Sequence, residues 1–88
     1  MAEFHPFTLF VFEDQLDVTA AHEMRYDDEV AAQEAWVVVK DAVDPRAVDG
    51  VTVRRAIVDV YDAVGVITLR PGNVRSMRLV RNPGPRSW

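Results

Sequence analysis

The chain has 88 residues, no cysteine and a formal net charge of −4. A chain of this length makes one domain with a thin core, and because 49% of its residues are apolar it is not a disordered polymer. The missing cysteines exclude a disulfide framework and thiolate chemistry. No apolar run approaches the roughly 20 residues that a membrane helix needs, and the first residues lack a secretory pattern. We therefore expect a protein that works, or is assembled, in the cytoplasm and makes no contact with a membrane.

The charge is divided unevenly along the chain. Residues 1–50 carry twelve acidic and three basic side chains, whereas residues 51–88 carry two acidic side chains and seven arginines. Such asymmetry predicts either an anionic partner or contact between the acidic face of one subunit and the basic face of the next. The alternative is that the two halves neutralise each other within one fold.

Two strands joined as a hairpin are predicted first. Residues 4–13 are aromatic and β-branched, with apolar side chains on both faces of the strand. Because a strand with two apolar faces is typical of a central position or a subunit contact, we take Phe10 and Phe12 as interface candidates. Residues 16–26 alternate between apolar and polar, as a half-buried strand does, and residues 13–15 are expected to form the turn between the strands.

One helix is predicted over about residues 28–43. Asp27 and Asp28 are suited to cap its first turn, alanines and valines then recur at helical spacing, and Pro45 ends the pattern. Val30 and Val37 fall on the polar side, seven residues apart. They are either isolated exposed valines or a second contact face, and we keep both as interface candidates.

Residues 51–64 give conflicting signals. Seven of these fourteen residues are Val, Ile or Thr, which favours a strand, whereas the spacing of the apolar positions favours a helix. With the strand as the first interpretation, residues 51–80 form an antiparallel β meander with a type II turn at Pro71-Gly72. The predicted fold is α+β: a hairpin, a helix and a meander in one domain over residues 1–81, followed by an irregular tail over residues 82–88.

If residues 52–64 are helical, part of the chain resembles a known protein family. Thr52-Val53-Arg54-Arg55-Ala56-Ile57, with Gly65-Val66-Ile67 and Arg70-Pro71-Gly72, resembles the recognition helix and wing of bacterial winged-helix repressors over about a quarter of the chain. The resemblance implies base contacts from Arg54 and Arg55, and phosphate contacts from Arg70, Arg75 and Arg78. Arg81 is a further candidate for contact with an anion.

No residue pattern typical of catalysis is found. His5 and His22 are isolated, and the sequence lacks a phosphate-binding loop, a nucleophile elbow, a zinc-protease motif and a calcium loop. We therefore expect no enzyme, cofactor or metal site. Trp88, a large side chain at the end of the tail, is the last interface candidate and is expected to occupy an apolar pocket.

Together these features predict a protein–protein assembly module. It would be a homo-oligomer or a small structural or accessory subunit of a larger complex, so that its partner is a second copy or another protein. A regulator that binds nucleic acid through the arginine-rich half is the alternative. The Ala, Val, Asp and Arg content favours a bacterial or bacteriophage origin.

Overall fold

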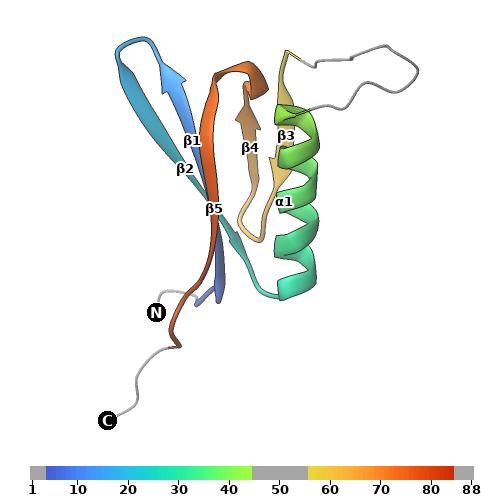
Figure 1. The fold of residues 1–88 in the computed structure, drawn as a ribbon. Helices are drawn as coiled ribbons and strands as arrows, with labels where there is room; N and C mark the ends of the chain where they lie inside the picture. The colour runs from blue at the N-terminus through green and yellow to red at the C-terminus, as the bar shows by residue number, and fades with distance from the viewer. Residues whose placement is uncertain (1–3, 45–55, 85–88) are drawn as a thin grey trace, which may run out of the picture.

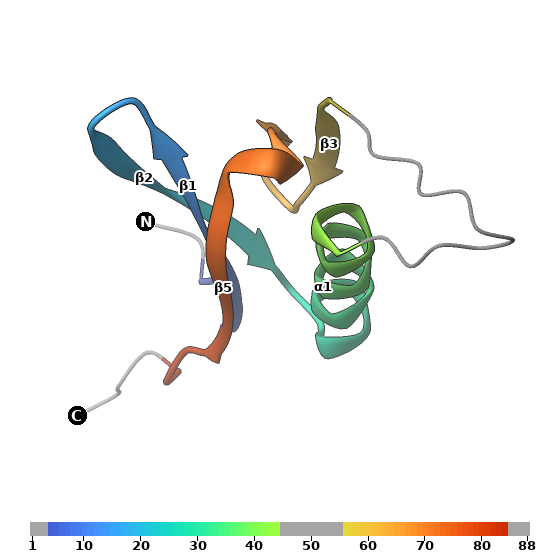
Figure 2. The same cartoon turned by 45° about the horizontal axis from the view of Figure 1, so that its top comes forward.

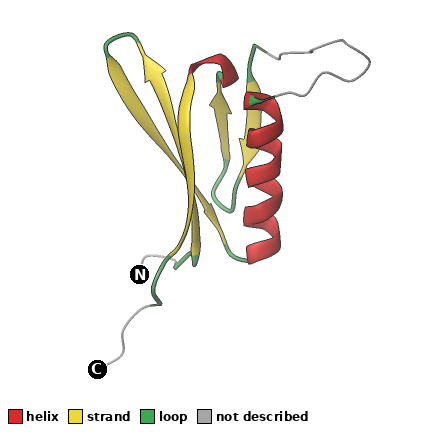
Figure 3. Ribbon diagram, viewed as in Figure 1, coloured by secondary structure: helices red, strands yellow, loops and turns green. Residues whose placement is uncertain are grey.

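The computed structural model describes residues 4–44 and 56–84. The elements, in chain order, are β1 (Phe7–Gln15), β2 (Val18–Tyr26), α1 (Glu29–Val43), β3 (Val58–Tyr61), β4 (Val66–Leu69), the short 3-10 helix η1 (Pro71–Asn73) and β5 (Val74–Arg81) (Figures 1 and 3). The predicted α+β class is confirmed, with an N-terminal hairpin, one helix and C-terminal antiparallel strands. Trp88 lies outside the described residues.

The strands form two sheets. A three-stranded antiparallel sheet has the order β2-β1-β5, and β3 pairs with β4 in a second sheet. The last strand therefore does not continue a meander, because it leaves β4 and pairs with β1. Strand length gives a physical reason: β5 has eight residues and β1 has nine, whereas β4 offers only four.

The chain changes sheets at η1. The N–H of Asn73 donates to the carbonyl of Arg70 at 2.9 Å, which closes a 3-10 turn. Gly72 does not adopt the positive φ that a type II turn requires, so the predicted turn type is wrong. The buried Pro71 fixes this turn against the core, and the chain then runs to the free edge of β1.

Residues 58–61 are a strand, so the helical alternative for residues 52–64 is wrong in this part of the chain. Val58 and Val60 are buried, whereas Asp59 and Tyr61 are exposed, which is the period of two that a half-buried strand shows. The β-branched side chains therefore outweigh the helical spacing. Residues 52–55, and with them the candidates Arg54 and Arg55, lie outside the described residues.

Helix α1 and the β3–β4 sheet lie on the same side of the three-stranded sheet (Figure 2). The helix begins where the sequence predicts, since the side chain of Asp28 accepts a hydrogen bond from the N–H of Ala31 at 2.8 Å. The buried apolar side chains form one core between these layers, made of Leu9, Val11, Met24, Tyr26, Ala32, Ala35, Val39, Val58, Val60 and Leu69. The inner faces of β1 and β2 are those that the alternation predicts.

The β1–β2 turn consists of Leu16 and Asp17, because the strands remain paired as far as Gln15 and Val18. The prediction of a turn over residues 13–15 is therefore wrong. Leu16 has a φ of 54°, in the left-handed region where a Cβ atom crowds the following carbonyl oxygen, and its side chain is fully exposed.

Replacing Leu16 with glycine is expected to raise the free energy of unfolding by about 0.5–1 kcal/mol, because glycine adopts a positive φ without strain. Nothing is lost from the core, since the leucine side chain is exposed. Leu16→Ala is the control, because it removes the same apolar surface but keeps the strained Cβ. Chemical denaturation of the three proteins measures the effect, and equal stability of the glycine and alanine variants would contradict it.

Candidate functional site

The outer face of the three-stranded sheet is covered by none of the described elements. Phe10 and Phe12 point to this face from the central strand, and their rings stack with centroids 6.4 Å apart and planes inclined by 16°. Both rings are half-buried, whereas the flanking side chains on β2 and β5 are mostly exposed. The two predicted interface residues therefore form an aromatic ridge on a sheet face whose other side chains are mostly polar.

Opposite charges flank this ridge at the same height. In the sheet register, Phe10 lies opposite Glu23 on β2 and opposite Arg78 on β5. Glu23 has a loose contact with Arg25 at 3.4 Å, with both side chains half exposed. Arg78 makes no ion pair with any described residue. At the level of Phe10, the ridge is thus bordered by an acidic side chain on β2 and by a basic side chain on β5.

The remaining arginine candidates do not form one basic surface. Arg70 lies 3.9 Å from the carboxylate of Glu13, and Arg75 lies 4.0 Å from that of Asp14. The guanidinium of Arg81 lies over the ring of Phe7, 5.9 Å from its centroid, on the inner face of the sheet. Among the described candidates, only Arg78 lies opposite a residue of the aromatic ridge in the sheet register.

A buried carboxylate connects β1 to the start of η1. Glu13 is 1% exposed and accepts hydrogen bonds from Nε2 of His22 at 3.2 Å and from the N–H of Arg70 at 3.3 Å. His22 is half-buried on the inner side of β2. The burial of Glu13 is not predicted by the sequence, which places this residue in an exposed turn. This cluster joins β1 and β2 to the start of η1.

The end of β2 is fixed to the β3–β4 turn. One carboxylate oxygen of Asp62 accepts from the N–H of Arg25 at 2.8 Å, and the other accepts from Val64 at 2.9 Å and Gly65 at 2.7 Å. The N–H of Ala63 in turn donates to the carbonyl of Arg25 at 2.8 Å. These bonds hold the second sheet beside the edge of the first.

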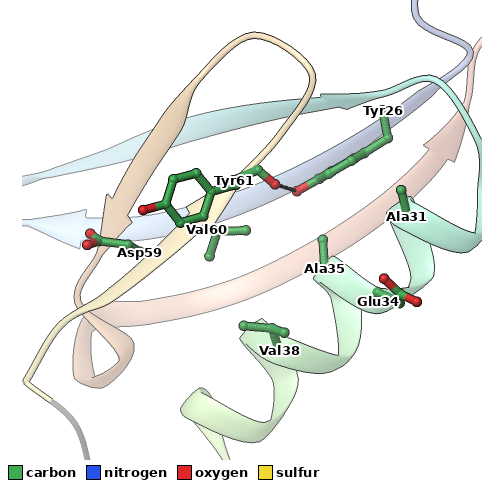
Figure 4. Close-up of a pocket in the computed structure, with 8 residues that line it drawn as sticks. All are labelled: Tyr26, Ala31, Glu34, Ala35, Val38, Asp59, Val60 and Tyr61. Carbon is green, nitrogen blue, oxygen red and sulfur yellow. Dashed lines mark hydrogen bonds between the residues drawn. The ribbon is translucent and has the colours of Figure 1, made fainter.

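The hydroxyl of Tyr26 strengthens the same junction. It donates to the carbonyl of Tyr61 at 2.9 Å, as Figure 4 shows. Burial and, to a smaller extent, the charge of Asp62 raise the pKa of Tyr26 to about 12. The hydroxyl therefore remains protonated, and remains a donor, at every pH at which the protein is expected to be folded.

A groove runs between α1 and β3, with a cavity volume of about 260 Å³. The helix contributes Ala31, Glu34, Ala35 and Val38, and the strands contribute Tyr26, Asp59, Val60 and Tyr61 (Figure 4). The side chains from the helix are small or apolar except for one carboxylate, and β3 adds a second. The groove is thus a shallow apolar channel with two acidic groups along it.

The predicted candidates on the helix border this groove. Val30 and Val37 are 66% and 53% exposed, and they line a neighbouring depression with Glu34 and Val38. Ile57, Tyr61, Val64 and Val66, in or next to the β3–β4 hairpin, are also exposed. The valines that interrupt the polar face of the helix are therefore exposed apolar side chains next to the groove.

The described part of the chain contains no group of three or more His, Asp or Glu side chains that could hold a metal ion. Its helix is neither long nor apolar enough to cross a membrane. Comparison of the chain with protein-family models, with curated proteins and with solved structures found no match.

Proposed function

We propose that this protein is a non-enzymatic assembly module of the cytoplasm that pairs with a second copy through the outer face of its three-stranded sheet. The observation that carries the proposal is the stacked pair of Phe10 and Phe12 on a sheet face that no described element covers. Two such faces can pack about 10 Å apart with their aromatic side chains between them, as in a β-sandwich. A cluster of aromatic side chains is also typical of the centre of a protein interface.

The charges on this face support a second copy as the partner. A two-fold axis parallel to β1 exchanges the two sides of the sheet, so that Glu23 of each copy faces Arg78 of the other. This follows because both residues lie opposite Phe10 in the register. The same rotation places the small side chains beside Phe12, Ala21 and Ser76, over each other, which leaves room for the rings. The face is therefore complementary to itself in charge and in shape, as an isologous interface must be.

Charge exchange across the interface provides the sharpest test. Glu23→Arg and Arg78→Glu are each expected to weaken dimerisation at least tenfold, because each creates two like-charged contacts per dimer. The double variant restores the opposite charges and is expected to dimerise nearly as well as the original protein. Asp41→Arg, on the exposed face of the helix, is the control for the change in charge. Sedimentation equilibrium over a range of protein concentrations measures the dissociation constants.

The aromatic ridge can be tested in the same measurement. Phe10→Thr keeps a β-branched residue in the strand but removes the ring, and it is expected to raise the dissociation constant at least tenfold. At about 1 M salt, where charges are screened beyond roughly 3 Å, the original dimer should weaken but persist. A chain that stays at 9.9 kDa at every concentration and salt level would overturn the proposal.

A further inference from the structure

We propose that the groove between α1 and β3 binds an extended peptide segment of a partner protein, which adds to β3 as a strand and places a lysine or arginine side chain in the groove. The site lies on the side of the three-stranded sheet opposite to the aromatic ridge. The proposal therefore stands independently of self-assembly.

The free edge of β3 has hydrogen-bonding groups to offer. The N–H of Asp62 donates to the carbonyl of Gly65 at 2.9 Å, and the carbonyl of Tyr61 accepts from Tyr26. Because hydrogen-bonded and non-hydrogen-bonded pairs alternate in an antiparallel ladder, both observations direct the backbone of Tyr61 and Asp59 away from β4. No described residue pairs with the N–H or carbonyl of Asp59, or with the N–H of Tyr61. This is the arrangement that an added strand recognises.

The helix beside this edge leaves room for a backbone. Ala31, Ala35 and Val38 follow one another on the helix face that turns toward β3, and two of the three are alanines (Figure 4). Neighbouring strands lie about 4.8 Å apart, so a peptide bonded to Asp59 would rest on these short side chains. The cavity of about 260 Å³ is slightly smaller than most ligand sites, which occupy roughly 300–1,000 Å³. It would therefore take one or two side chains, while the rest of the peptide follows the edge.

The acidic side chains of the groove favour a basic side chain in the bound peptide. Glu34 and Asp59 line it, and neither carboxylate forms an ion pair with a described residue. Asp59 is held in place by the hydroxyl of Thr68, which donates to it at 2.6 Å. Glu34 and Asp59 lie at opposite ends of the groove (Figure 4), so a lysine or arginine of the peptide would compensate one of them, whereas an acidic peptide would add a third like charge.

Peptide arrays test the preference for a basic side chain. One array holds nine-residue peptides of randomised Val, Thr, Ala and Ser with arginine fixed at the centre, and a matched array has glutamate there. The arginine array is expected to contain binders, and replacing their central residue by glutamate should weaken binding at least tenfold. Glu34→Lys should weaken the same peptides at least fivefold. Asp41→Lys, an equal change of charge on the exposed face of the same helix, should leave their affinity unchanged.

N-methylation of the peptide backbone distinguishes strand pairing from non-specific hydrophobic binding, which does not depend on backbone N–H groups. Methylating the backbone nitrogens of the best peptide one at a time should weaken binding at least fivefold at alternate positions only, because only every second N–H faces β3. Hydrogen exchange at the amides of Asp59 and Tyr61 should slow when the peptide is bound.

Three results would overturn the inference: an arginine array without binders, binding that ignores N-methylation, or binding that ignores Glu34→Lys. Dimers of the free protein that dissociate in Glu34→Lys would show that the groove holds a second copy instead. Repeating the titration with Phe10→Thr separates the two proposals, because loss of the sheet-face dimer should leave peptide affinity unchanged.

Discussion

Replacing Glu13 with alanine is expected to lower the free energy of unfolding by about 3 kcal/mol. The carboxylate is 1% exposed and accepts from His22 and from the N–H of Arg70, so its removal leaves two inward-pointing donors without their partner and opens a cavity. In a domain of this size, each kcal/mol changes the melting temperature by roughly 4–8 °C. The melting temperature of the alanine variant should therefore fall by at least about 12 °C.

The neighbouring residue provides a matched control for this prediction. Asp14 is exposed; its carboxylate accepts a hydrogen bond from the hydroxyl of Thr19 at 2.9 Å and lies 4.0 Å from Arg75. Asp14→Ala should therefore change stability by no more than about 0.5 kcal/mol. Glu13→Gln keeps the shape and one acceptor, so its loss should lie between the two. Thermal unfolding that shows Glu13→Ala to be as mild as Asp14→Ala would mean that water satisfies His22 and Arg70.

Local patterns in the sequence predict much of the fold. Alternation over residues 18–26 places Met24 and Tyr26 on the inner face, and the aspartate at position 28 marks the start of the helix. These signals depend on neighbours within one or two turns of the chain, so they can be recognised without the tertiary structure. The two apolar faces of β1 likewise predict its central position in the sheet.

Long-range pairing could not be predicted in this way. Whether β5 joins β4 or β1 depends on how the whole chain closes, and turn residues alone suggest the nearer partner. Glu13 is buried where β1 continues past it to Gln15 and where the pairing with β5 shifts between Phe12 and Glu13. A polar residue after an apolar run otherwise indicates a turn, so the sequence favours the wrong environment.

The residues of the candidate sites likewise fall into two groups: those that local patterns predict and those that depend on long-range contacts. Phe10, Phe12, Val30 and Val37 were recognisable because each breaks the expected polar face of its element. Asp59 and Tyr61 were not, since the groove exists only after a strand and a helix far apart in sequence come together. The role of Asp62 had a local signal that was missed. An aspartate followed three residues later by glycine is typical of a turn in which the carboxylate bonds the backbone ahead of it.

Replacing Asp62 with asparagine is the second substitution expected to have a large effect, with a loss of about 1–2 kcal/mol at pH 7. Both carboxylate oxygens act as acceptors, and an amide nitrogen in place of one of them would face an N–H group. The loss is smaller than for Glu13 because the turn is partly exposed to water. Asp41→Asn makes the same chemical change on the exposed face of the helix and should be nearly neutral.

The pH dependence of unfolding tests whether the charge of the Asp62 carboxylate causes the stability difference between the original protein and Asp62→Asn. Burial alone would raise the pKa of Asp62, but the N–H groups of Arg25, Gly65 and Val64, with the charge of Arg25, lower it below its ordinary value of 3.8. A group with a lowered pKa in the folded state contributes its full stabilisation above the unfolded value and loses it as the pH falls through the folded value. The difference in unfolding free energy between the original protein and Asp62→Asn should therefore be constant from pH 7 to about pH 5 and shrink below pH 3.8. Urea unfolding at a series of pH values measures it, and a difference that is the same at pH 3 and pH 7 would show that the charge of Asp62 does not hold the two sheets together.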